Sequence, residues 1–306
     1  MIVIGSRGSK LALWQAHHVA GQLNALGHET RIEIIKTSGD EIQDVPLSQV
    51  GGKALFTKEI EEALLADDID LAVHSMKDVP TELPPGLIIA AIPEREDPHD
   101  ALVGCKVDQL LDGLRVGTSS LRRSSQLLAL NPRLSVEMLR GNVDTRLRKL
   151  DESEYDAIVL AAAGLRRLGW QDRIRELIPV EIMCPAVGQG ALAIETRDDG
   201  GAAQQVARQL DHPETNTAVT CERAMLAVLG GGCQVPIGGY AYVEKGIIHM
   251  RAIVASPDGT KVVRAELSGV NPARTGASIG RNLLEKGAAA ILRELDSGAH
   301  SAGRNP

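Results

Sequence analysis

Aromatic side chains are scarce in this chain of 306 residues, which contains one Phe, two Trp and three Tyr. Proteins that bind single-stranded nucleic acid commonly stack bases on exposed rings, so this composition argues against such a surface. Hydrophobic residues nevertheless make up 43% of the chain. The cores must therefore be built from Leu, Ile, Val and Ala, and we expect a globular protein that does not bind nucleic acid.

The chain also lacks any apolar run of the roughly 20 residues that a membrane-spanning helix needs, and no basic leader follows Met1. Cysteines are few, and Cys105, Cys184, Cys221 and Cys233 form no CxxC pair. Disulfides are disfavoured in a reducing compartment. We expect a cytoplasmic protein with no membrane segment, no metal site and thiols that are free unless something modifies them.

The net charge of -7 conceals an uneven distribution. Residues 1–96 carry eight basic and fifteen acidic side chains, whereas residues 115–175 carry twelve basic and seven acidic ones. A basic region inside an acidic protein indicates a local anion site, since a nucleic-acid footprint would need a broader basic face. A solvated charged surface is the alternative explanation.

The first two thirds of the chain alternate short β-rich runs with helical patterns, which is typical of α/β domains with a mostly parallel sheet. A charged stretch ending in proline at 94–98 and a glycine-rich turn at 185–190 each indicate a crossing between two lobes, and two crossings predict a hinge above a cleft. The predicted strands are 2–5, 31–36, 70–74, 87–92, 114–118, 135–139, 157–162 and 191–195, and the helices are 9–26, 56–66, 120–130, 142–151 and 163–168.

The pattern changes after residue 214, where a helix over 215–229 precedes three strands joined by hairpin turns. The strands are predicted at 236–243, 247–255 and 260–268, and a helix over 273–295 would cover one face of the antiparallel sheet. The expected domains are 1–95 with 190–211, then 98–187, and an α+β domain over 214–306 with a disordered tail from about residue 297.

Basic and hydroxyl residues recur where a predicted strand ends and a helix begins, which is where open α/β sheets bind ligands. Gly117–Arg123 offers helix N–H groups, hydroxyls and two guanidiniums, a combination that can hold an anion. Leu139–Asn142 and Gly5–Ser9 repeat this arrangement. Each string alone is also explained by a helix cap and solvated arginines, but three on successive strand ends indicate a ligand with several carboxylates or phosphates.

Two further strings carry chemically useful side chains. His74–Pro80 places Lys77 beside Asp78 at a strand end, where Asp78 could stabilise a cation or move a proton; a surface ion pair is the commoner explanation. Gly230–Gly232 removes side chains beside Cys233, so this thiol could lie on an open loop; a helix cap followed by a buried cysteine is the alternative. Gly51–Lys53 lacks the spacing of a phosphate-binding P-loop.

Eight strings in this order resemble the porphobilinogen deaminase family, with dense similarity over residues 4–240. They occupy residues 6–15 (SRGSKLALWQ), 50–59 (VGGKALFTKE), 72–80 (AVHSMKDVP), 94–98 (EREDP), 117–123 (GTSSLRR), 139–150 (LRGNVDTRLRKL), 185–191 (PAVGQGA) and 230–238 (GGGCQVPIG). Many members have proline where this chain has Lys10; proline would be favourable there but is not required.

The resemblance implies two lobes arranged as in periplasmic binding proteins and a third domain that presents a cysteine loop. It implies a dipyrromethane cofactor attached by a thioether to Cys233, and a transferase that joins four porphobilinogen units head to tail, releases ammonia each time and frees hydroxymethylbilane by hydrolysis. Asp78 would stabilise the azafulvenium-like cation left when ammonia departs. No partner beyond the small-molecule substrate is implied, and a monomer is expected.

The resemblance also assigns residues to the carboxylates of the cofactor and the growing chain. These are Arg7, Ser9, Lys77, Thr118, Ser120, Arg122, Arg123, Arg140, Arg146 and Arg167, with Gln15, Lys53, Phe56, Ser75 and Gln189 nearby. A non-catalytic two-lobed binder of polycarboxylates or oxyanions is the alternative function. It explains the arginines and the hinge but leaves the cysteine loop, the Lys77–Asp78 pair and the third domain unexplained.

Overall fold

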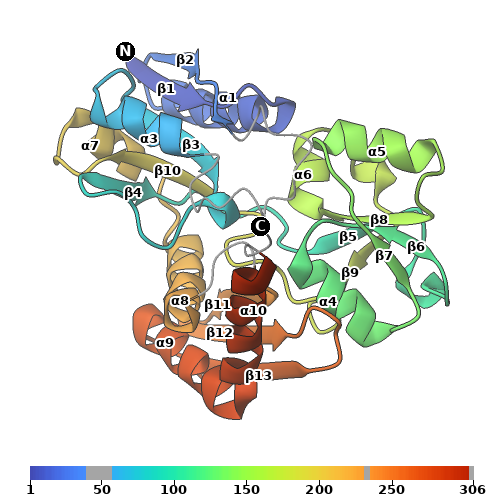
Figure 1. Cartoon of the computed structure of the whole chain (residues 1–306). Coiled ribbons are helices and arrows are strands. Elements are labelled where there is room, and N and C mark those ends of the chain that lie inside the picture. The colour runs from blue at the N-terminus through green and yellow to red at the C-terminus, as the bar shows by residue number, and fades with distance from the viewer. Residues whose placement is uncertain (39–56, 231–234, 303–306) are drawn as a thin grey trace.

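The structure, a computed structural model, describes residues 1–38, 57–230 and 235–302. Two α/β lobes and a third domain make up the molecule (Figure 1). The predicted fold class is confirmed, since each lobe has a mixed sheet with helices and the third domain has a three-stranded antiparallel sheet. No helix in these ranges combines the length and apolar character that crossing a membrane requires.

The first lobe is built on a five-stranded sheet in the order β2-β1-β3-β10-β4, in which β10 runs antiparallel to both neighbours. Helices α1 and α7 cover one face and α3 covers the other, because each presents a stripe of apolar residues to the sheet. The elements are β1 (Ile2–Ser6), α1 (Lys10–Ala25), β2 (Thr30–Ile34), α3 (Lys58–Leu65), β3 (Leu71–Ser75), a 3-10 turn η1 (Met76–Asp78), β4 (Leu87–Ala91), β10 (Leu192–Arg197) and α7 (Ala202–Arg208).

The second lobe repeats this arrangement with the order β7-β6-β8-β5-β9, in which β5 is the antiparallel strand. Helix α4 packs on one face, and α5 and α6 pack on the other. The elements are β5 (Asp100–Val103), η2 (Val107–Gln109), β6 (Arg115–Gly117), α4 (Leu121–Leu130), β7 (Ser135–Glu137), α5 (Val143–Asp151), β8 (Ala157–Ala161), α6 (Ala162–Arg167), η3 (Gln171–Arg173) and β9 (Glu176–Ile178).

The two crossings between the lobes lie side by side. The Glu96 N–H donates to the Gly190 carbonyl at 3.2 Å, and the Gln189 side-chain amide donates to the Pro98 carbonyl at 2.7 Å. Gly190 has a φ of +87°, and a Cβ at this position would collide with the Glu96 carbonyl oxygen. Only glycine therefore lets the crossings approach this closely.

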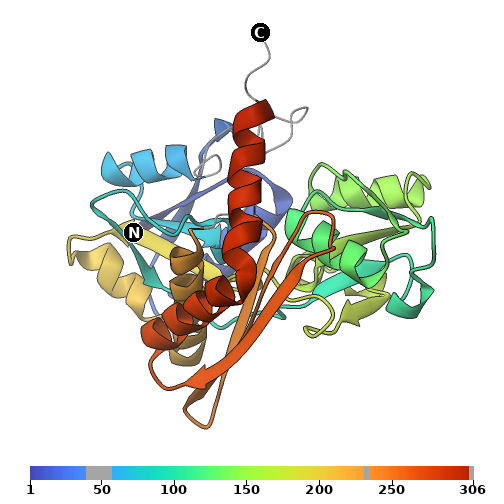
Figure 2. The same cartoon turned by 60° about the horizontal axis from the view of Figure 1, so that its bottom comes forward.

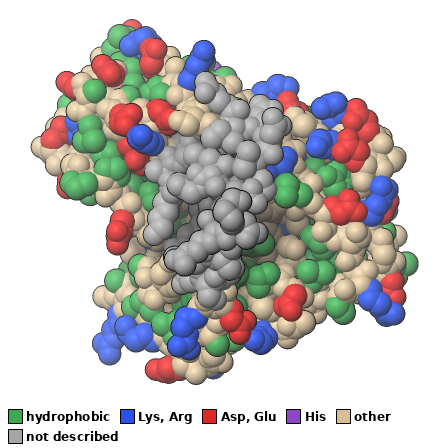
Figure 3. Space-filling view, viewed as in Figure 1, with side chains coloured by type: hydrophobic (Ala, Val, Ile, Leu, Met, Phe, Trp, Pro, Cys, Tyr) green, Lys and Arg blue, Asp and Glu red, His purple; other side chains and the backbone are tan. Residues whose placement is uncertain are grey.

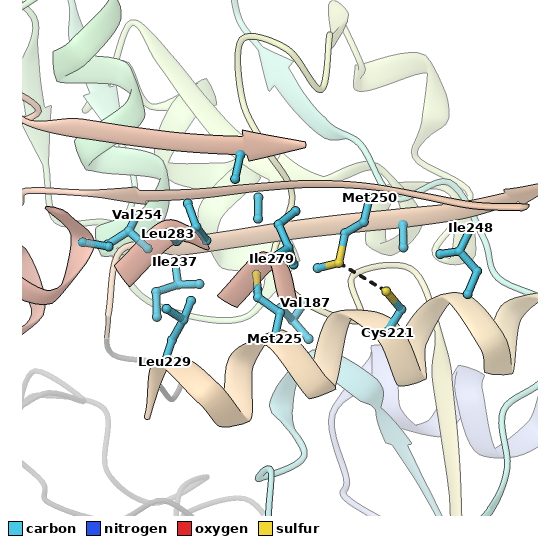
Figure 4. Packing of buried hydrophobic residues seen from close by; sticks show 14 of the residues in the cluster. Val187, Cys221, Met225, Leu229, Ile237, Ile248, Met250, Val254, Ile279 and Leu283 are labelled. Carbon is cyan, nitrogen blue, oxygen red and sulfur yellow. Dashed lines mark hydrogen bonds between the residues drawn. The ribbon is translucent and has the colours of Figure 1, made fainter. Parts of the chain in front are cut away.

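The third domain packs α8 and α9 against one face of the sheet β11-β12-β13. Figure 4 shows Cys221 and Met225 of α8 pointing toward strand residues such as Met250, whose sulfur lies 3.3 Å from the Cys221 sulfur. The elements are α8 (Pro213–Leu229), β11 (Ile237–Glu244), β12 (Ile247–Ala255), β13 (Val262–Gly269), α9 (Pro272–Leu283), a π-helical turn η4 (Leu284–Ala288) and α10 (Ala289–Ala302).

The C-terminal helix differs from its prediction in two ways. The helix predicted over 273–295 is broken at Gly287, whose φ of 111° is not helical, so that α10 leaves the domain at an angle to α9 (Figure 2). Helix α10 then continues to Ala302, which corrects the expectation of a disordered tail from about residue 297. Once a helix is nucleated, each added residue gains one backbone hydrogen bond, so weak helix formers can extend it.

A buried ion pair ties the third domain to both crossings. Arg95 of the first crossing donates to both carboxylate oxygens of Glu222 on α8, at 2.6 and 3.3 Å, and its Nε donates to the Gln189 carbonyl. Glu222 is fully buried and also accepts the backbone N–H groups of Gly188 and Ala241. The pair therefore holds two crossings, one helix and one strand together.

Replacing Glu222 by glutamine is expected to lower the free energy of unfolding by about 3–5 kcal/mol, because the Arg95 charge loses its partner and the amide NH2 group faces backbone donors. Urea denaturation of the purified protein measures this change. The matched control is Glu152→Gln, which removes an exposed partner of Arg148 and should cost less than about 1 kcal/mol. Equal effects of the two substitutions would contradict the anchoring role.

Candidate functional site between the lobes

Asp78 lies at the end of η1, directly after the buried strand β3. The strand end is fixed by the Gln15 side-chain amide, which donates to the Ser75 hydroxyl at 2.9 Å, and by the Met76 N–H, which donates to the Ala191 carbonyl. Asp78 itself is exposed. The first lobe thus presents one carboxylate to solvent from a rigid support.

Lys77, the neighbour of Asp78, is half-buried and lies within electrostatic range of the second lobe. Burial lowers the pKa of the Lys77 ammonium, the charge of Asp78 acts in the opposite direction, and the charge of Arg123 adds to the lowering. The charge of Lys77 therefore interacts with a carboxylate of its own lobe and with a guanidinium of the other.

The second lobe contributes Arg146, whose charge interacts with that of Asp78, and Arg140, whose charge interacts with that of Arg146. The Arg146 Nε donates to the Gly141 carbonyl at 2.7 Å, which fixes the guanidinium on the first turn of α5. Burial, together with the charges of Arg123 and Arg140, lowers the pKa of Arg146 to about 10, and the charge of Asp78 acts in the opposite direction. A carboxylate of the first lobe and a cation of the second therefore lie close enough for their charges to interact.

Arg122 and Arg123 do not simply face a ligand, because both are buried and paired with Asp100 at the start of β5. Arg122 directs four N–H donors at the Asp100 carboxylate, the Cys184 carbonyl and the Gln189 amide oxygen. A guanidinium has five such donors. While these four bonds are kept, one N–H donor of Arg122 remains for a ligand. The carboxylate-binding role predicted for Arg122 is therefore limited to a single hydrogen bond.

Asp100 is a residue of this site that the sequence analysis missed. Burial acts to raise the pKa of its carboxyl, but the charges of Arg122 and Arg123 outweigh this effect and hold the pKa well below its usual range. Asp100 also accepts from the Gln189 amide at 3.1 Å. In the sequence, Asp100 is recognisable only as an acidic residue at the start of the otherwise apolar run 100–103. This pattern does not indicate which residues pair with it.

The predicted hydroxyl residues occupy helix starts. Ser9 caps α1 and accepts from the Ala12 N–H at 3.3 Å, and Ser120 is the N-cap residue of α4. Thr118 is buried and its hydroxyl oxygen accepts from the Ser120 N–H. Arg7 is half-buried just beyond the end of β1. These positions agree with the predicted pattern of strand ends followed by helix N-termini.

Arg167 and Gln189 lie at the crossings. The buried Arg167 donates to the Gly190 carbonyl at 2.7 Å, and its guanidinium carbon lies 5.8 Å from the centre of the Trp14 ring on α1. Burial lowers the pKa of Arg167 to about 10. Close by, Lys10 of α1 pairs with Asp144 of α5 at 3.1 Å. The two lobes therefore touch along α1 beside the crossings.

Three predicted site residues, Lys53, Phe56 and Cys233, lie outside the described residues. The part of the chain that the structure describes contains no group of three or more His, Cys, Asp or Glu side chains placed to hold a metal ion. Basic and acidic side chains are intermixed over the face of the molecule seen in Figure 3. On that face, the charge does not form the broad basic surface of a nucleic-acid-binding protein.

Comparisons with known proteins match most of the chain. The family model described as "Porphobilinogen deaminase, dipyromethane cofactor binding domain" matches residues 2–205, and "Porphobilinogen deaminase, C-terminal domain" matches residues 216–286. The chain is 50% identical over 303 residues to a porphobilinogen deaminase from Syntrophobacter fumaroxidans, covering 96% of this chain and 98% of the relative.

A porphobilinogen deaminase from Geobacillus kaustophilus is also 50% identical, over 300 residues that cover 96% of this chain and 97% of the relative. A solved structure of a periplasmic substrate-binding protein from Coxiella burnetii covers 70% of this chain and 93% of its own, at 14% identity and a TM-score of 0.41. That likeness is too low to support a conclusion.

Proposed function

The chain belongs to the porphobilinogen deaminase family, and we propose that Asp78 and the cations around it carry out the family's reaction. The activity is the stepwise head-to-tail condensation of four porphobilinogen molecules with release of ammonia, followed by hydrolysis to hydroxymethylbilane. The enzyme is a transferase of tetrapyrrole biosynthesis. The proposal assigns roles in this activity to individual residues.

One observation supports the proposal most directly: Asp78 of the first lobe lies within electrostatic range of Lys77 and of Arg146 in the second. Each porphobilinogen carries an acetate and a propionate, so binding requires several cations. The same substrate becomes cationic at its methylene carbon when ammonia departs. A single exposed carboxylate beside half-buried cations suits both needs, since it can face the developing positive charge while the cations hold the carboxylates.

Asp78 acts in the proposed mechanism through its two carboxylate oxygens. They accept hydrogen bonds from pyrrole N–H groups and orient the substrate for attack. Their negative charge lowers the energy of the cation that forms as ammonia leaves, and one oxygen takes up and returns the proton that moves during coupling. The support of β3 and η1 keeps the carboxylate in place, so little reorganisation is needed at the moment of reaction.

The donor set also fits a dipyrromethane cofactor, which carries several carboxylates of its own. The pKa of Arg146 is already lowered by burial and by neighbouring arginines, and that of Lys77 by burial and Arg123, so bound carboxylates would relieve an unfavourable concentration of positive charge. Residues proposed to hold it are Lys77, Arg140 and Arg146, with the hydroxyls of Thr118 and Ser120 and those N–H donors of Arg123 that Asp100 and Val159 do not use. When bound, the cofactor supplies an anchored pyrrole to which substrate units are joined.

The proposed attachment point of this cofactor is the Cys233 thiol, through a thioether. Support comes from the family resemblance of the surrounding residues and from the other cysteines, all of which are buried. Burial raises the pKa of Cys105 to about 11 and those of Cys184 and Cys221 to about 12. Such thiols carry little thiolate at neutral pH and are poor nucleophiles.

We further propose a cytoplasmic monomer with porphobilinogen as its substrate and no nucleic-acid or membrane partner. The proposed boundaries place residues 1–95 and 190–211 in the first lobe, 98–187 in the second and 214–306 in the third domain. The remaining predicted contacts, from Arg7, Ser9 and Arg167 to substrate carboxylates, belong to the same proposal.

The test of the activity is the stoichiometry of the purified protein with porphobilinogen. Release of four ammonia molecules for each hydroxymethylbilane formed is the expected result. A protein that binds porphobilinogen without releasing ammonia would instead support the non-catalytic binder.

Replacing Arg140 by alanine is expected to weaken the hold on partly built chains by about tenfold or more, because a charge-assisted contact to a carboxylate is lost. The mass distribution of enzyme-bound intermediates after limiting porphobilinogen measures this effect, and longer chains should be depleted. Arg133→Ala is the matched control, since Arg133 pairs with Asp112 on the surface of the same lobe. A distribution like that of the unaltered enzyme would count against the role of Arg140.

A further inference from the structure

The backbone that follows Asp78 is held by one side chain of the third domain. Arg223 of α8 donates to the Val79 carbonyl at 3.2 Å, to the Pro80 carbonyl at 2.6 Å and to the Thr81 carbonyl at 3.3 Å. Its Nη1 also lies 3.8 Å from the Met76 sulfur. A single guanidinium thus contacts the residues before and after Asp78 without pairing with its carboxylate in any of these bonds.

An arginine is chemically suited to this task. Its guanidinium is planar and carries five N–H donors in a fixed fork, so it can bind several carbonyl oxygens and fix their relative directions. Lysine offers a flexible point charge in place of this fork. Pro80 has no backbone N–H to donate, so a carbonyl contact is a direct way to fix the chain at this point.

The part of α8 that carries Arg223 is itself held in place. Its neighbour Glu222 forms the buried pair with Arg95 and accepts the Gly188 N–H at 2.7 Å. One turn earlier on α8, Val219 packs in the same apolar cluster as Met76 and Val79. Glu222 and Arg223, which are adjacent on α8, therefore hold the crossings and the Asp78 turn in fixed positions relative to each other.

The second crossing closes the other side of this turn. Gly188 has a φ of +72°, and a Cβ built there would lie 3.2 Å from the Lys77 backbone nitrogen and would also collide with the Met76 side chain. The turn is thus enclosed between the second crossing and α8, and its position depends on groups from outside the first lobe.

We propose that Arg223 is a positioning residue for Asp78: by binding the carbonyls of Val79, Pro80 and Thr81 it holds the Asp78 carboxylate where the substrate cation forms. The inference rests on the proposed function of Asp78. It adds that the third domain takes part in the chemistry of the first lobe through the fixed geometry of this turn.

The test uses the complete, cofactor-bearing enzyme with Arg223→Lys and Arg223→Gln, and Arg281→Lys as the control. Arg281 is an exposed arginine of α9 in the same domain that donates to Ser278. Intact mass first establishes how much of each preparation carries the cofactor, and rates are given per cofactor-bearing molecule, so partial unfolding lowers the yield and leaves the rate unaffected. For both Arg223 variants kcat should fall about tenfold to a hundredfold, since small displacements of a reacting group have such effects.

The Michaelis constant separates positioning from binding. KM should change by less than about threefold, because the carboxylate-binding cations are not altered. A rise in KM with unchanged kcat would overturn the inference, as would a kcat of Arg223→Lys equal to that of Arg281→Lys.

A double-mutant cycle tests whether Arg223 acts through Asp78. In an Asp78→Glu background the carboxylate is already displaced, so Arg223→Lys should reduce the remaining rate by much less than it does alone. Full additivity would show an independent structural role and would overturn the inference. Activity of Asp78→Asn at the normal rate would refute the proposed function itself, which is a separate outcome.

Discussion

Asparagine at position 78 is expected to lower kcat for hydroxymethylbilane formation by about a thousandfold or more while leaving the protein folded. The amide has nearly the shape of the carboxylate but no charge, so it cannot stabilise the substrate cation, and it cannot take up a proton. Loss of a general acid–base group costs about 10² to 10⁴ in rate, and loss of a preorganised electrostatic contact costs a similar factor. The expected fall combines parts of both effects.

Stability should hardly change in this variant, because Asp78 is exposed and exposed substitutions usually alter the free energy of unfolding by less than about 0.5 kcal/mol. Asp172→Asn is a matched control, since Asp172 is an exposed aspartate in another 3-10 turn, η3. Steady-state kinetics and urea denaturation of both variants measure the changes in kcat and in the free energy of unfolding. A kcat within about threefold of the unaltered enzyme would exclude the proposed role of Asp78.

Serine in place of Cys233 is expected to give a protein without covalently bound pyrrole and without turnover. A hydroxyl is far less nucleophilic than a thiolate at neutral pH, so the thioether has no counterpart at serine. Intact mass of the purified protein should show two linked pyrroles on the unaltered enzyme and no addition on the variant. Peptide mapping should then locate the added mass on the peptide that contains Cys233.

Cys105→Ala provides the control for this experiment, because the Cys105 thiol is buried and its pKa is raised to about 11. That variant should keep both the added mass and the activity. Pyrrole retained by Cys233→Ser would show that the attachment lies elsewhere. Unmodified Cys233 in protein from cells that make porphobilinogen would equally contradict the proposal.

Local patterns predicted most secondary structure to within one or two residues. The strand predicted over 157–162 is β8 (Ala157–Ala161), and the helix over 142–151 is α5 (Val143–Asp151). Such elements follow from hydrophobic periodicity and turn residues, which act over a few positions. Strands β5 and β9 and helix α7 were missed. The two strands form through pairing between distant segments: β5 pairs with β8 and with β9, and these pairs have no local signal in the sequence.

The candidate site, too, was predicted only in part from the sequence. Residue types and their order identified the family and placed Asp78, Lys77, Arg140 and Arg146 at strand ends. Among them, the Asp78 charge acts on Lys77 and on Arg146, and the Arg140 charge acts on Arg146. No pattern indicated that Asp100 would neutralise two of the predicted arginines. An acidic residue 22 positions before its partner has no local signal, because the contact exists only after β5 and α4 have packed.

The sequence by itself determined the family, the two crossings, most of the strands and helices, and the chemical character of the site. These depend on side-chain identity and on short-range conformational preference. Only the tertiary structure decided which cations remain available for a ligand and which residues hold Asp78. Arg223 lies 145 residues beyond Asp78 in the sequence, and its hydrogen bonds to Val79–Thr81 arise because α8 packs beside the crossings. Hydrogen bonds and ion pairs depend on distance and direction in space, and folding alone brings such remote groups together.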